Sequence, residues 1–366
     1  MRINQLNRFA VTLLLAFTTL LPLINTAIAA EGAKPKVIRL GWVGNKYDKP
    51  YTSGVVGYAQ QTKAWEKEFE KDGITIEWNF FKGTGPAINE AIANGKLDFA
   101  SSGDLPSTAG RAGGLPTRVI VGQGASGGKR YVLVAANSTI TKPADLIGKR
   151  ITFQKGTYAH LMWNRYARDV LGKDGEKDFK VYSLTGGDQD VALSSGSVDA
   201  IFPGSLDLVY RKTARVIDTL TDDKYPTIAS NANSVYTTQQ FIDKYPDIVY
   251  RWVKVYLQLA DELYQEKNRD YANKLGTLSG SSLKSVVEGI DDKGDIRYAN
   301  LPILDDYYKK QIKAAVNDEI KYKLIRKPVD VDIWWERSFY DRALKELGLD
   351  VKWKDIINRR AAEVKN

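Results

Sequence analysis

A fifteen-residue pattern occurs twice in this chain, 101 residues apart and without a gap. The first copy, residues 84–98, reads TGPAINEAIANGKLD, and the second, residues 185–199, reads TGGDQDVALSSGSVD. Both copies fit the pattern T-G-x5-A-[IL]-x2-G-x-[LV]-D. Seven ungapped matches indicate an internal repeat rather than coincidence. A chain of this kind is expected to fold as two similar halves.

Each copy describes the end of a strand, a helix and the start of the next strand. The hydroxyl of Thr84 or Thr185 is expected to cap the helix, because a side-chain oxygen satisfies free N–H groups there. Gly95 and Gly196 are expected to end the helices in the left-handed conformation. Further strands are expected at 37–43, 74–80, 150–154 and 179–184, and helices at 53–69 and 158–171. Strands that alternate with helices predict parallel sheets.

The part of the chain from about Asn233 onward is predicted to be helical and to cover the first half. Trp252, Tyr256 and Leu259 recur at helical spacing and are expected in the core. The predicted helices span residues 238–244, 247–266, 283–289, 304–319 and 335–347.

The fold class expected from these patterns is α/β, with two lobes that each hold a parallel-rich sheet flanked by helices. The first lobe comprises residues 30–130 and 234–366, and the second comprises residues 131–233. The chain then crosses between the lobes twice. Two crossings form a hinge, which suits closure around a ligand.

The first 29 residues are interpreted as a secretory signal peptide. Arg2 and Arg8 accompany an apolar stretch at 9–24, and residues 27–29 form a small-x-small cleavage pattern. The alternative is a membrane anchor, but the stretch is short for a span, which needs about 20 apolar residues. The chain also lacks a cysteine for lipid attachment. We therefore expect export to the periplasm.

Composition argues against most catalytic and redox chemistry. The chain has no cysteine, which excludes disulfides, a cysteine nucleophile and thiolate metal sites. His160 is the only histidine and is expected to pack inside a helix, so neither a metal nor a cofactor is predicted. The net charge is +9, but the basic residues are interleaved with acids, as at 66–68 and 222–224. Nucleic-acid binding requires a clustered basic patch, so no nucleic-acid partner is expected.

The candidate binding residues follow the predicted strands. In open α/β sheets, ligands bind beyond the carboxyl ends of the strands, and helix starts there attract anions through free N–H groups. The expected ligand is therefore small and anionic. The predicted ligand-binding residues are Asn45, Tyr47, Thr84, Gly85, Pro86, Ser102, Gly103, Asp104, Thr157, Tyr158, Gly186, Gly187, Gly204 and Ser205.

Several of these residues have an alternative, purely structural interpretation. Thr84 is as well explained as a helix cap, and Asp104 is better explained as a cap for the helix at Pro106. Gly85 and Gly103 could serve backbone geometry alone. Lys46, Lys49, Lys129 and Arg130 could steer an anion electrostatically, although surface cations usually have no specific role.

The sequence resembles the aliphatic-sulfonate/taurine/nitrate-type substrate-binding proteins of ABC importers. The segments that carry the resemblance are 82–91, 95–99, 103–106, 143–150, 155–160, 196–200 and 241–246. The resemblance implies a monomeric type II periplasmic binding fold that delivers its ligand to an ABC permease in the inner membrane. It also implies that the anion, such as a sulfonate, taurine or nitrate, is held around Thr84-Gly85-Pro86, Ser102-Gly103 and Thr157-Tyr158.

Two departures from the family pattern fall at the expected cleft. Residues 202–205 read Phe-Pro-Gly-Ser where the family often has a Trp-Asp-Pro-like segment, and the loop 44–52 is longer and more aromatic than usual. These changes favour a larger or aromatic organic group beside the anion.

Three function classes remain for the sequence, and the first explains most of its features. The first is a transport binding protein that is not an enzyme. The second is an enzyme on the same fold that acts on a small anionic or heteroaromatic substrate, which would need a nucleophile–base pair. The nearest carboxylate motif, 188–190, is better explained as acidic charge at a helix start. The third is a ligand sensor that signals to a membrane partner.

Overall fold

The computed structural model describes residues 34–44, 52–123, 128–221, 224–229, 232–290 and 295–365. The predicted signal peptide and the predicted ligand contacts Asn45 and Tyr47 lie outside these ranges. No helix within the ranges has both the length and the apolar character that a bilayer-crossing segment requires.

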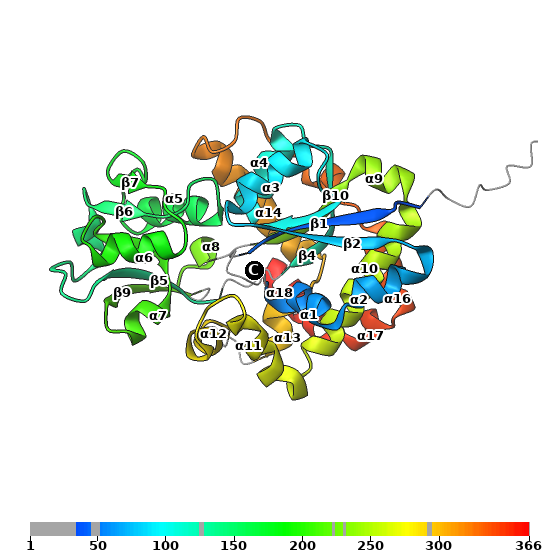
Figure 1. Ribbon diagram of the computed structural model, residues 1–366. Coiled ribbons are helices and arrows are strands. Elements are labelled where there is room, and N and C mark those ends of the chain that lie inside the picture. Colours follow the sequence, from blue (N-terminus) through cyan, green and yellow to red (C-terminus); the bar gives the residue numbers. More distant parts are fainter. Residues whose placement is uncertain are drawn as a thin grey trace, which may run out of the picture. The chain divides into compact units, whose positions relative to one another are not determined.

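The first sheet has five strands in the order β2-β1-β3-β10-β4. Its parallel part consists of β1 (Val37–Val43), flanked by β2 (Thr75–Phe81) and β3 (Phe99–Ser102). Next to β3, β10 (Asn233–Thr238) runs antiparallel to both β3 and β4 (Thr117–Gln123). A strand from late in the chain therefore completes a sheet that the N-terminal residues begin (Figure 1).

The second sheet repeats this plan with the order β7-β6-β8-β5-β9. Here β6 (Arg150–Thr152) lies parallel to β7 (Lys180–Tyr182) and to β8 (Ala200–Gly204). The antiparallel position next to β8 is taken by β5 (Arg130–Ala135), which also pairs with β9 (Ala214–Leu220). The predicted fold class, two parallel-rich sheets in an α/β architecture, is confirmed.

The chain passes between the sheets twice. It leaves the first sheet after Gln123, enters the second at Arg130, leaves it after Leu220 and returns at Asn233. Both sheets belong to one compact unit, Lys34–Asn366. The division into two lobes at these crossings, and their role as a hinge, stay predictions.

Helices cover both faces of each sheet. In β5, Val132 and Val134 face a core that includes α5, whereas Leu133 faces a separate core with α6 and α7. The helices that accompany the sheets are α1 (Gly54–Thr62), α2 (Ala64–Phe69), α3 (Thr84–Ala93), α4 (Asp104–Ala112), α5 (Tyr158–Asp169), α6 (Gly187–Ser194), α7 (Leu206–Tyr210) and α8 (Pro226–Ala229). The predicted helix at 53–69 is broken into α1 and α2 because Lys63 has a left-handed φ of 53°.

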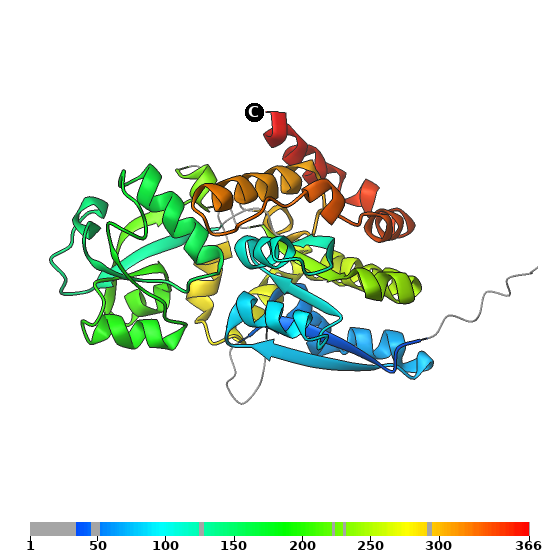
Figure 2. The ribbon, with the colours of Figure 1, turned by 90° about the horizontal axis from the view of Figure 1, so that it is seen from above.

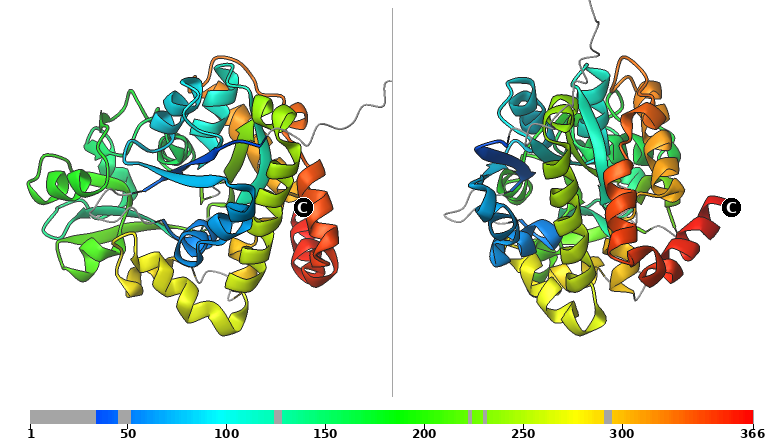
Figure 3. Two further views of the ribbon diagram at one scale, coloured as in Figure 1. Left: turned by 45° about the vertical axis from the view of Figure 1, so that its right-hand side comes forward. Right: turned by 90° about the vertical axis from the view of Figure 1, so that its right-hand side faces the viewer.

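Most helices after β10 pack on the first sheet, as expected (Figure 3), whereas α12 (Leu283–Ile290) contacts α11 (Arg269–Thr277) and, through Lys284 over the Tyr210 ring, α7. Trp252 of α10 is fully buried, and its ring lies 4.5 Å from that of Trp65 and 4.6 Å from that of Phe99. The predictions for α9, α10, α12, α14 and α16 are confirmed. The C-terminal helices are α9 (Gln239–Lys244), α10 (Pro246–Leu263), α11 (Arg269–Thr277), α12 (Leu283–Ile290), α13 (Ile296–Asn300), α14 (Asp306–Lys321), α15 (Val331–Trp334), α16 (Ser338–Glu346), α17 (Leu349–Lys352) and α18 (Lys354–Lys365).

The repeat is visible in the same set of hydrogen bonds in both halves. Asp98 accepts the backbone N–H of Arg39 at 2.8 Å and the Nη2–H of the same residue at 2.8 Å. Asp199 accepts the corresponding groups of Arg150 at 2.8 and 2.7 Å. The last residue of each repeat therefore fixes the first residues of a central strand. The left-handed Gly95 and Gly196, with φ of 63° and 72°, are confirmed as well.

Removing either aspartate of the repeat should destabilise its own sheet, and more so in the first half. The Asp98 side chain is 7% exposed and the Asp199 side chain is 25% exposed. Substitution of Asp98 therefore removes hydrogen bonds that are better shielded from water. Charge-assisted hydrogen bonds of this kind contribute about 2 kcal/mol. We expect Asp98→Ala to lower the free energy of unfolding by that order and Asp199→Ala by less, as measured by urea denaturation. Equal losses in the two variants would contradict this ranking.

The predicted helix caps at Thr84 and Thr185 are wrong. Gly83 is the N-cap of α3, and Thr84 is its first residue, while Gly186 is the N-cap of α6. Gly186 has a φ of 48°, a conformation that favours glycine, whereas Gly83 has an ordinary φ of −71°. The acidic residues of 188–190 lie in the first turn of α6, as expected.

Candidate ligand-binding site

A cavity of about 400 Å³ is lined by residues from elements of both sheets. The first sheet contributes the end of β1 and the starts of α1, α3 and α4, and the second contributes β5 and the start of α5. The described lining residues are Trp42, Val43, Thr52, Ser53, Val56, Thr84, Gly85, Ser101, Ser102, Gly103, Pro106, Gln123, Arg130, Gln154, Thr157, Tyr158 and Asn233.

The cavity brings together predicted residues from three helix starts. Thr84 and Gly85 begin α3, Ser102 and Gly103 precede α4, and Thr157 and Tyr158 begin α5. Together with the start of α1, four helix N-termini therefore meet at this cavity, and each offers free N–H groups and a partial positive charge. That these residues contact a ligand stays a prediction.

Thr84 carries two features that its helix does not explain. Its φ is 57°, a left-handed conformation that β-branched residues rarely adopt. Its hydroxyl oxygen is buried and forms no hydrogen bond. Strained residues and unpaired buried polar atoms concentrate at functional sites, because packing alone gives no reason to keep them.

Gly85 is required by packing at the cavity wall. A Cβ there would lie 2.3 Å from the Cβ of Pro106, so only glycine lets the starts of α3 and α4 approach this closely. Close packing of α3 on α4 therefore explains this glycine and brings two helix N-termini to the same wall, and a ligand contact at Gly85 stays a prediction.

Gln154, Thr157 and Tyr158 form, together with Arg130, the part of the cavity wall that the second sheet contributes. The Thr157 hydroxyl donates to the Gln154 carbonyl at 2.8 Å and accepts from the Ala159 N–H at 3.3 Å, which makes it the N-cap of α5. The Gln154 amide donates across the cavity rim to the Gly83 carbonyl at 3.3 Å. This loop therefore touches the start of α3 as well as the cavity.

Arg130, the first residue of β5, contributes the one charged side chain among the described lining residues. Its Nη1–H donates to the Lys129 carbonyl at 3.1 Å, and its buried Nε–H has no hydrogen-bond partner. The structure shows no ion pair for Arg130 within the described ranges. A guanidinium with a shielded, unpaired N–H is well suited to bind an anion.

The rest of the wall combines neutral polar groups with an apolar surface. Ser102 shares a 2.9 Å hydrogen bond with the Tyr236 hydroxyl, and Ser101 donates to Gln123 at 2.9 Å. Trp42, Val56 and Pro106 supply the apolar part. The cavity can therefore accommodate an anionic group and an organic group side by side.

Asp104 and Pro86 lie next to the wall without belonging to the described lining. Asp104 is the first residue of α4 and accepts the N–H of Leu105 at 2.8 Å, while Gly103 is the N-cap, so the cap assigned to Asp104 is corrected. Burial raises the pKa of Asp104 to about 6. Pro86 lies against the second-sheet loop, where a Cβ on Gly156 would be 3.2 Å from its Cγ.

Four predicted residues of the second sheet are not among the described lining residues. Gly186 and Gly187 are exposed at the start of α6. Gly204 packs on β5, where a Cβ would lie 2.4 Å from the Leu133 side chain. Ser205 is exposed and caps α7 by accepting the Asp207 N–H at 3.2 Å. Their residue types are thus explained by local structure.

Sequence reasoning missed the residues that reach the cavity only through tertiary folding. Gln123 and Asn233 stand at the two crossings between the sheets, and Trp42 ends β1. The sequence does indicate part of this, because the predicted lobe boundaries at 130/131 and 233/234 place Arg130 and Asn233 at the crossings. Arg130 had been considered only for long-range steering.

The fold and the cavity together define a periplasmic-binding-protein architecture. The chain belongs to the NMT1/THI5-like family, which matches residues 52–268. An aliphatic sulfonates-binding protein of Bacillus subtilis is 31% identical over 288 residues, which cover 78% of this chain and 83% of that protein. The family resemblance drawn from the sequence motifs is confirmed.

Solved structures agree with this assignment. A periplasmic sulfonate-binding protein, SsuA of a sulfonate ABC transporter from Methylobacillus flagellatus, superposes with a TM-score of 0.71 at 26% identity and covers 86% of this chain and 95% of its own. The desulfurization enzyme DszB shares the fold with a TM-score of 0.59 at 16% identity, over 84% of this chain and 99% of its own. The relatives with clear sequence similarity are binding proteins.

Proposed function

We propose that this chain is the periplasmic solute-binding component of an ABC importer and that it captures an organic sulfonate. One observation carries the proposal. The described cavity wall presents four helix N-termini, several hydroxyls and the Arg130 guanidinium, and its described residues include no carboxylate. Such a wall stabilises an anion without requiring a proton or a metal.

The apolar surface and the volume favour an organic anion over a small inorganic one. A cavity of about 400 Å³ falls in the range that encloses small organic ligands. Trp42, Val56 and Pro106 would contact the organic group. The names of the Bacillus subtilis relative and of SsuA, both sulfonate-binding proteins, support the sulfonate assignment.

The proposal includes a route to the membrane. Residues 1–29 would direct export to the periplasm, and a monomeric ligand-loaded protein would dock on an ABC permease. The two lobes would close over the cavity by a hinge at the two crossings. The closed, ligand-loaded form would then be the one that the permease binds. The relatives support this route, since SsuA is described as periplasmic and as part of an ABC transporter.

Ligand-induced thermal stabilisation tests the proposal. We expect 1-butanesulfonate and an arylsulfonate to raise the melting temperature, because a ligand that binds only the folded state stabilises it. Taurine, nitrate and bicarbonate should give smaller shifts. If nitrate and bicarbonate alone stabilise the protein, the organic-sulfonate assignment is wrong.

A double variant checks the position of the site. Thr157→Ala with Tyr158→Ala should weaken butanesulfonate binding at least about tenfold, because the cavity loses two polar groups. The melting temperature of the ligand-free protein should fall only slightly, by the loss of one helix cap. A large fall in melting temperature with unchanged affinity would show that both residues are structural.

The shared fold of DszB makes catalysis the alternative to test. Butanesulfonate incubated with the protein should be recovered unchanged, with no sulfite released. Release of sulfite in proportion to protein concentration would identify an enzyme. Neighbouring genes for a permease and an ATPase would favour transport over sensing.

A further inference from the structure

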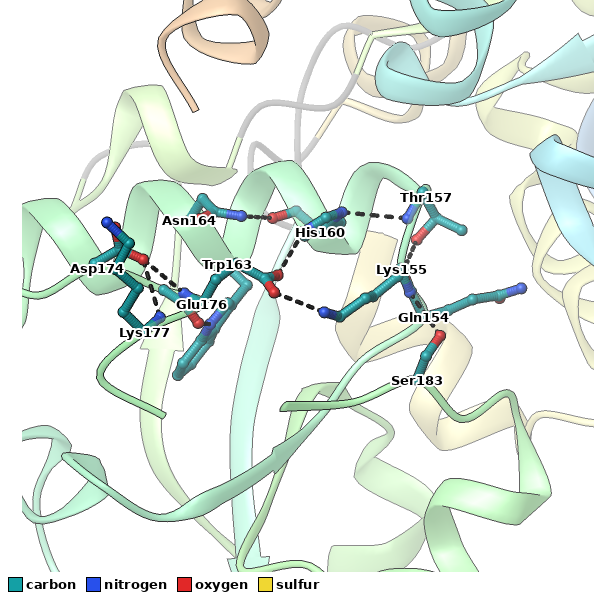
Figure 4. Close-up of polar contacts among 12 residues, drawn as sticks. Gln154, Lys155, Thr157, His160, Trp163, Asn164, Asp174, Glu176, Lys177 and Ser183 are labelled. Atoms are coloured by element: carbon teal, nitrogen blue, oxygen red, sulfur yellow. Dashed lines mark hydrogen bonds and ion pairs between the residues drawn. The ribbon is translucent and has the colours of Figure 1, made fainter. Parts of the chain in front are cut away.

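His160, the only histidine of the chain, lies directly behind the loop that lines the cavity. Its Nδ1 is 3.3 Å from the backbone nitrogen of Gly156, and its Nε2 is 2.8 Å from Glu176 (Figure 4). The second carboxylate oxygen of Glu176 accepts the Lys155 ammonium at 2.6 Å. His160 therefore connects two residues of the cavity loop to the segment before β7.

The hydrogen bonds define which ring nitrogen carries the proton. A backbone N–H can only donate, so the Nδ1 that faces Gly156 must be an unprotonated acceptor. The proton then sits on Nε2 and is donated to Glu176. His160 is thus neutral in the state that holds the loop, with its ring stacked on Phe153 at 5.3 Å.

Loop 154–158, which contacts His160, both lines the cavity and contacts its opposite wall. Thr157 and Tyr158 line it directly, and Gln154 bonds to Gly83 on the opposite wall. Gly156 needs its left-handed φ of 76° and lies against Pro86, so the loop adopts its shape only with this glycine in place. Its N–H has His160 as its acceptor in the structure.

We propose that His160, oriented by Glu176, is a positioning residue that holds loop 154–158 in its binding conformation and makes ligand affinity depend on pH. Its effect on affinity rests on the proposed function, whereas its effect on the loop does not. A second proton on the imidazole would occupy Nδ1, remove the acceptor for Gly156 and release the loop.

The charged groups that face the imidazole set the direction of this pH dependence. Burial lowers the pKa of His160, Glu176 raises it through the hydrogen bond and its charge, and Lys155 lowers it. The neutral form therefore dominates at neutral pH. Affinity should be constant there and should fall once the pH drops through the pKa of His160, which lies below the ordinary value of about 6.5.

The single histidine makes a direct NMR test possible. In untagged protein labelled with ¹⁵N, the imidazole gives one pair of nitrogen signals, which report both tautomer and pKa. We expect the Nε2–H tautomer at pH 7.5 and a Gly156 amide shift that titrates with the same midpoint as the ring. By linkage, saturating 1-butanesulfonate should lower the pKa of the ring. The acid dissociation constant should rise by the same factor by which protonation weakens binding.

Variants outside the cavity wall should move the midpoint in opposite directions. Glu176→Gln removes a group that raises the pKa of His160, so the fall in butanesulfonate affinity should shift to lower pH. Lys155→Gln removes a group that lowers it, so the fall should shift to higher pH. His160→Phe keeps the ring packing but lacks the acceptor, and should bind about tenfold more weakly at pH 7.5. His160→Gln keeps an acceptor and should restore affinity without the pH dependence.

The outcomes separate this inference from the proposed function. An Nδ1–H tautomer overturns the positioning role even if butanesulfonate binds. So does a Gly156 amide shift that does not change as the ring titrates. If butanesulfonate does not bind wild-type protein at any pH, the proposed function fails, and a Gly156 amide that follows the ring still supports the role of His160 in holding the loop.

Discussion

Arg130→Gln should weaken 1-butanesulfonate binding by roughly 10- to 100-fold, the effect of losing a charge-assisted hydrogen bond of about 1.5–3 kcal/mol. The guanidinium lines the cavity, and its buried Nε–H has no partner among the described residues. Glutamine keeps part of the side-chain volume but not the charge. Isothermal titration calorimetry at constant ionic strength measures the change directly.

The ligand-free melting temperature should barely change in this variant. Within the described ranges Arg130 has no ion pair, and its Nη1–H donates to the carbonyl of its neighbour, Lys129. Arg211→Gln is the matched control, because Arg211 is exposed, lies outside the described cavity wall and pairs with Asp190 at 3.3 Å. It removes the same charge and should leave affinity unaltered. Equal affinity losses in the two variants would mean that Arg130 acts only through net charge, and no loss in either would place the anion elsewhere.

The architecture could be predicted from the sequence because the repeat fixes local geometry. Each copy ends in an aspartate that binds the first residues of a central strand, Arg39 in one half and Arg150 in the other. The contacts join residues 59 and 49 positions apart, but the strands, helices and glycine caps that bring them together follow short-range patterns, which periodicity reveals. The same patterns misled at Thr84, where a threonine after a glycine was interpreted as a cap although the glycine itself holds that position.

The site could be predicted only where it coincides with helix starts. Ser102 ends β3, and Thr157 caps α5 one short loop after β6, so the rule for open α/β sheets finds them. Gln123, Arg130 and Asn233 reach the cavity because the chain crosses between the sheets beside it, which is a property of the tertiary fold. Gly204 is not among the described lining residues, and its packing against the Leu133 side chain explains it, because a glycine required by packing looks the same in sequence as one that approaches a ligand.

A set of polar side chains, which includes the buried Glu319, connects α4, α5 and α14, and α5 and α14 lie side by side (Figure 2). Arg165 of α5 is 2% exposed and donates to Asp318 of α14 at 2.8 Å. The neighbouring Glu319 is fully buried, accepts the Thr108 hydroxyl of α4 at 2.5 Å and has one carboxylate oxygen without a partner. Burial, followed by the nearby charge of Asp104, raises the pKa of Glu319 to about 8.

This carboxyl group should make the protein less stable as the pH rises. In the unfolded chain the pKa of Glu319 returns to its ordinary value near 4.5, so between about pH 4.5 and 8 the folded state binds a proton that the unfolded state has lost. The free energy of unfolding therefore falls over this window. Each pH unit of separation corresponds to about 1.4 kcal/mol, so the loss amounts to a few kcal/mol once the pH exceeds 8.

Glu319→Gln should remove this loss. Glutamine has the shape of the protonated acid and cannot ionise, so the variant should match wild type near pH 4.5 and melt several degrees higher at pH 9. Asp318→Asn is the matched control on the adjacent residue, because it removes the carboxylate partner of Arg165 and should destabilise the protein at neutral pH. Melting curves of wild type and the two variants between pH 4.5 and 9 test whether Glu319 is protonated in the folded protein. If the difference between Glu319→Gln and wild type does not grow with pH, then Glu319 is not protonated in the folded protein at neutral pH.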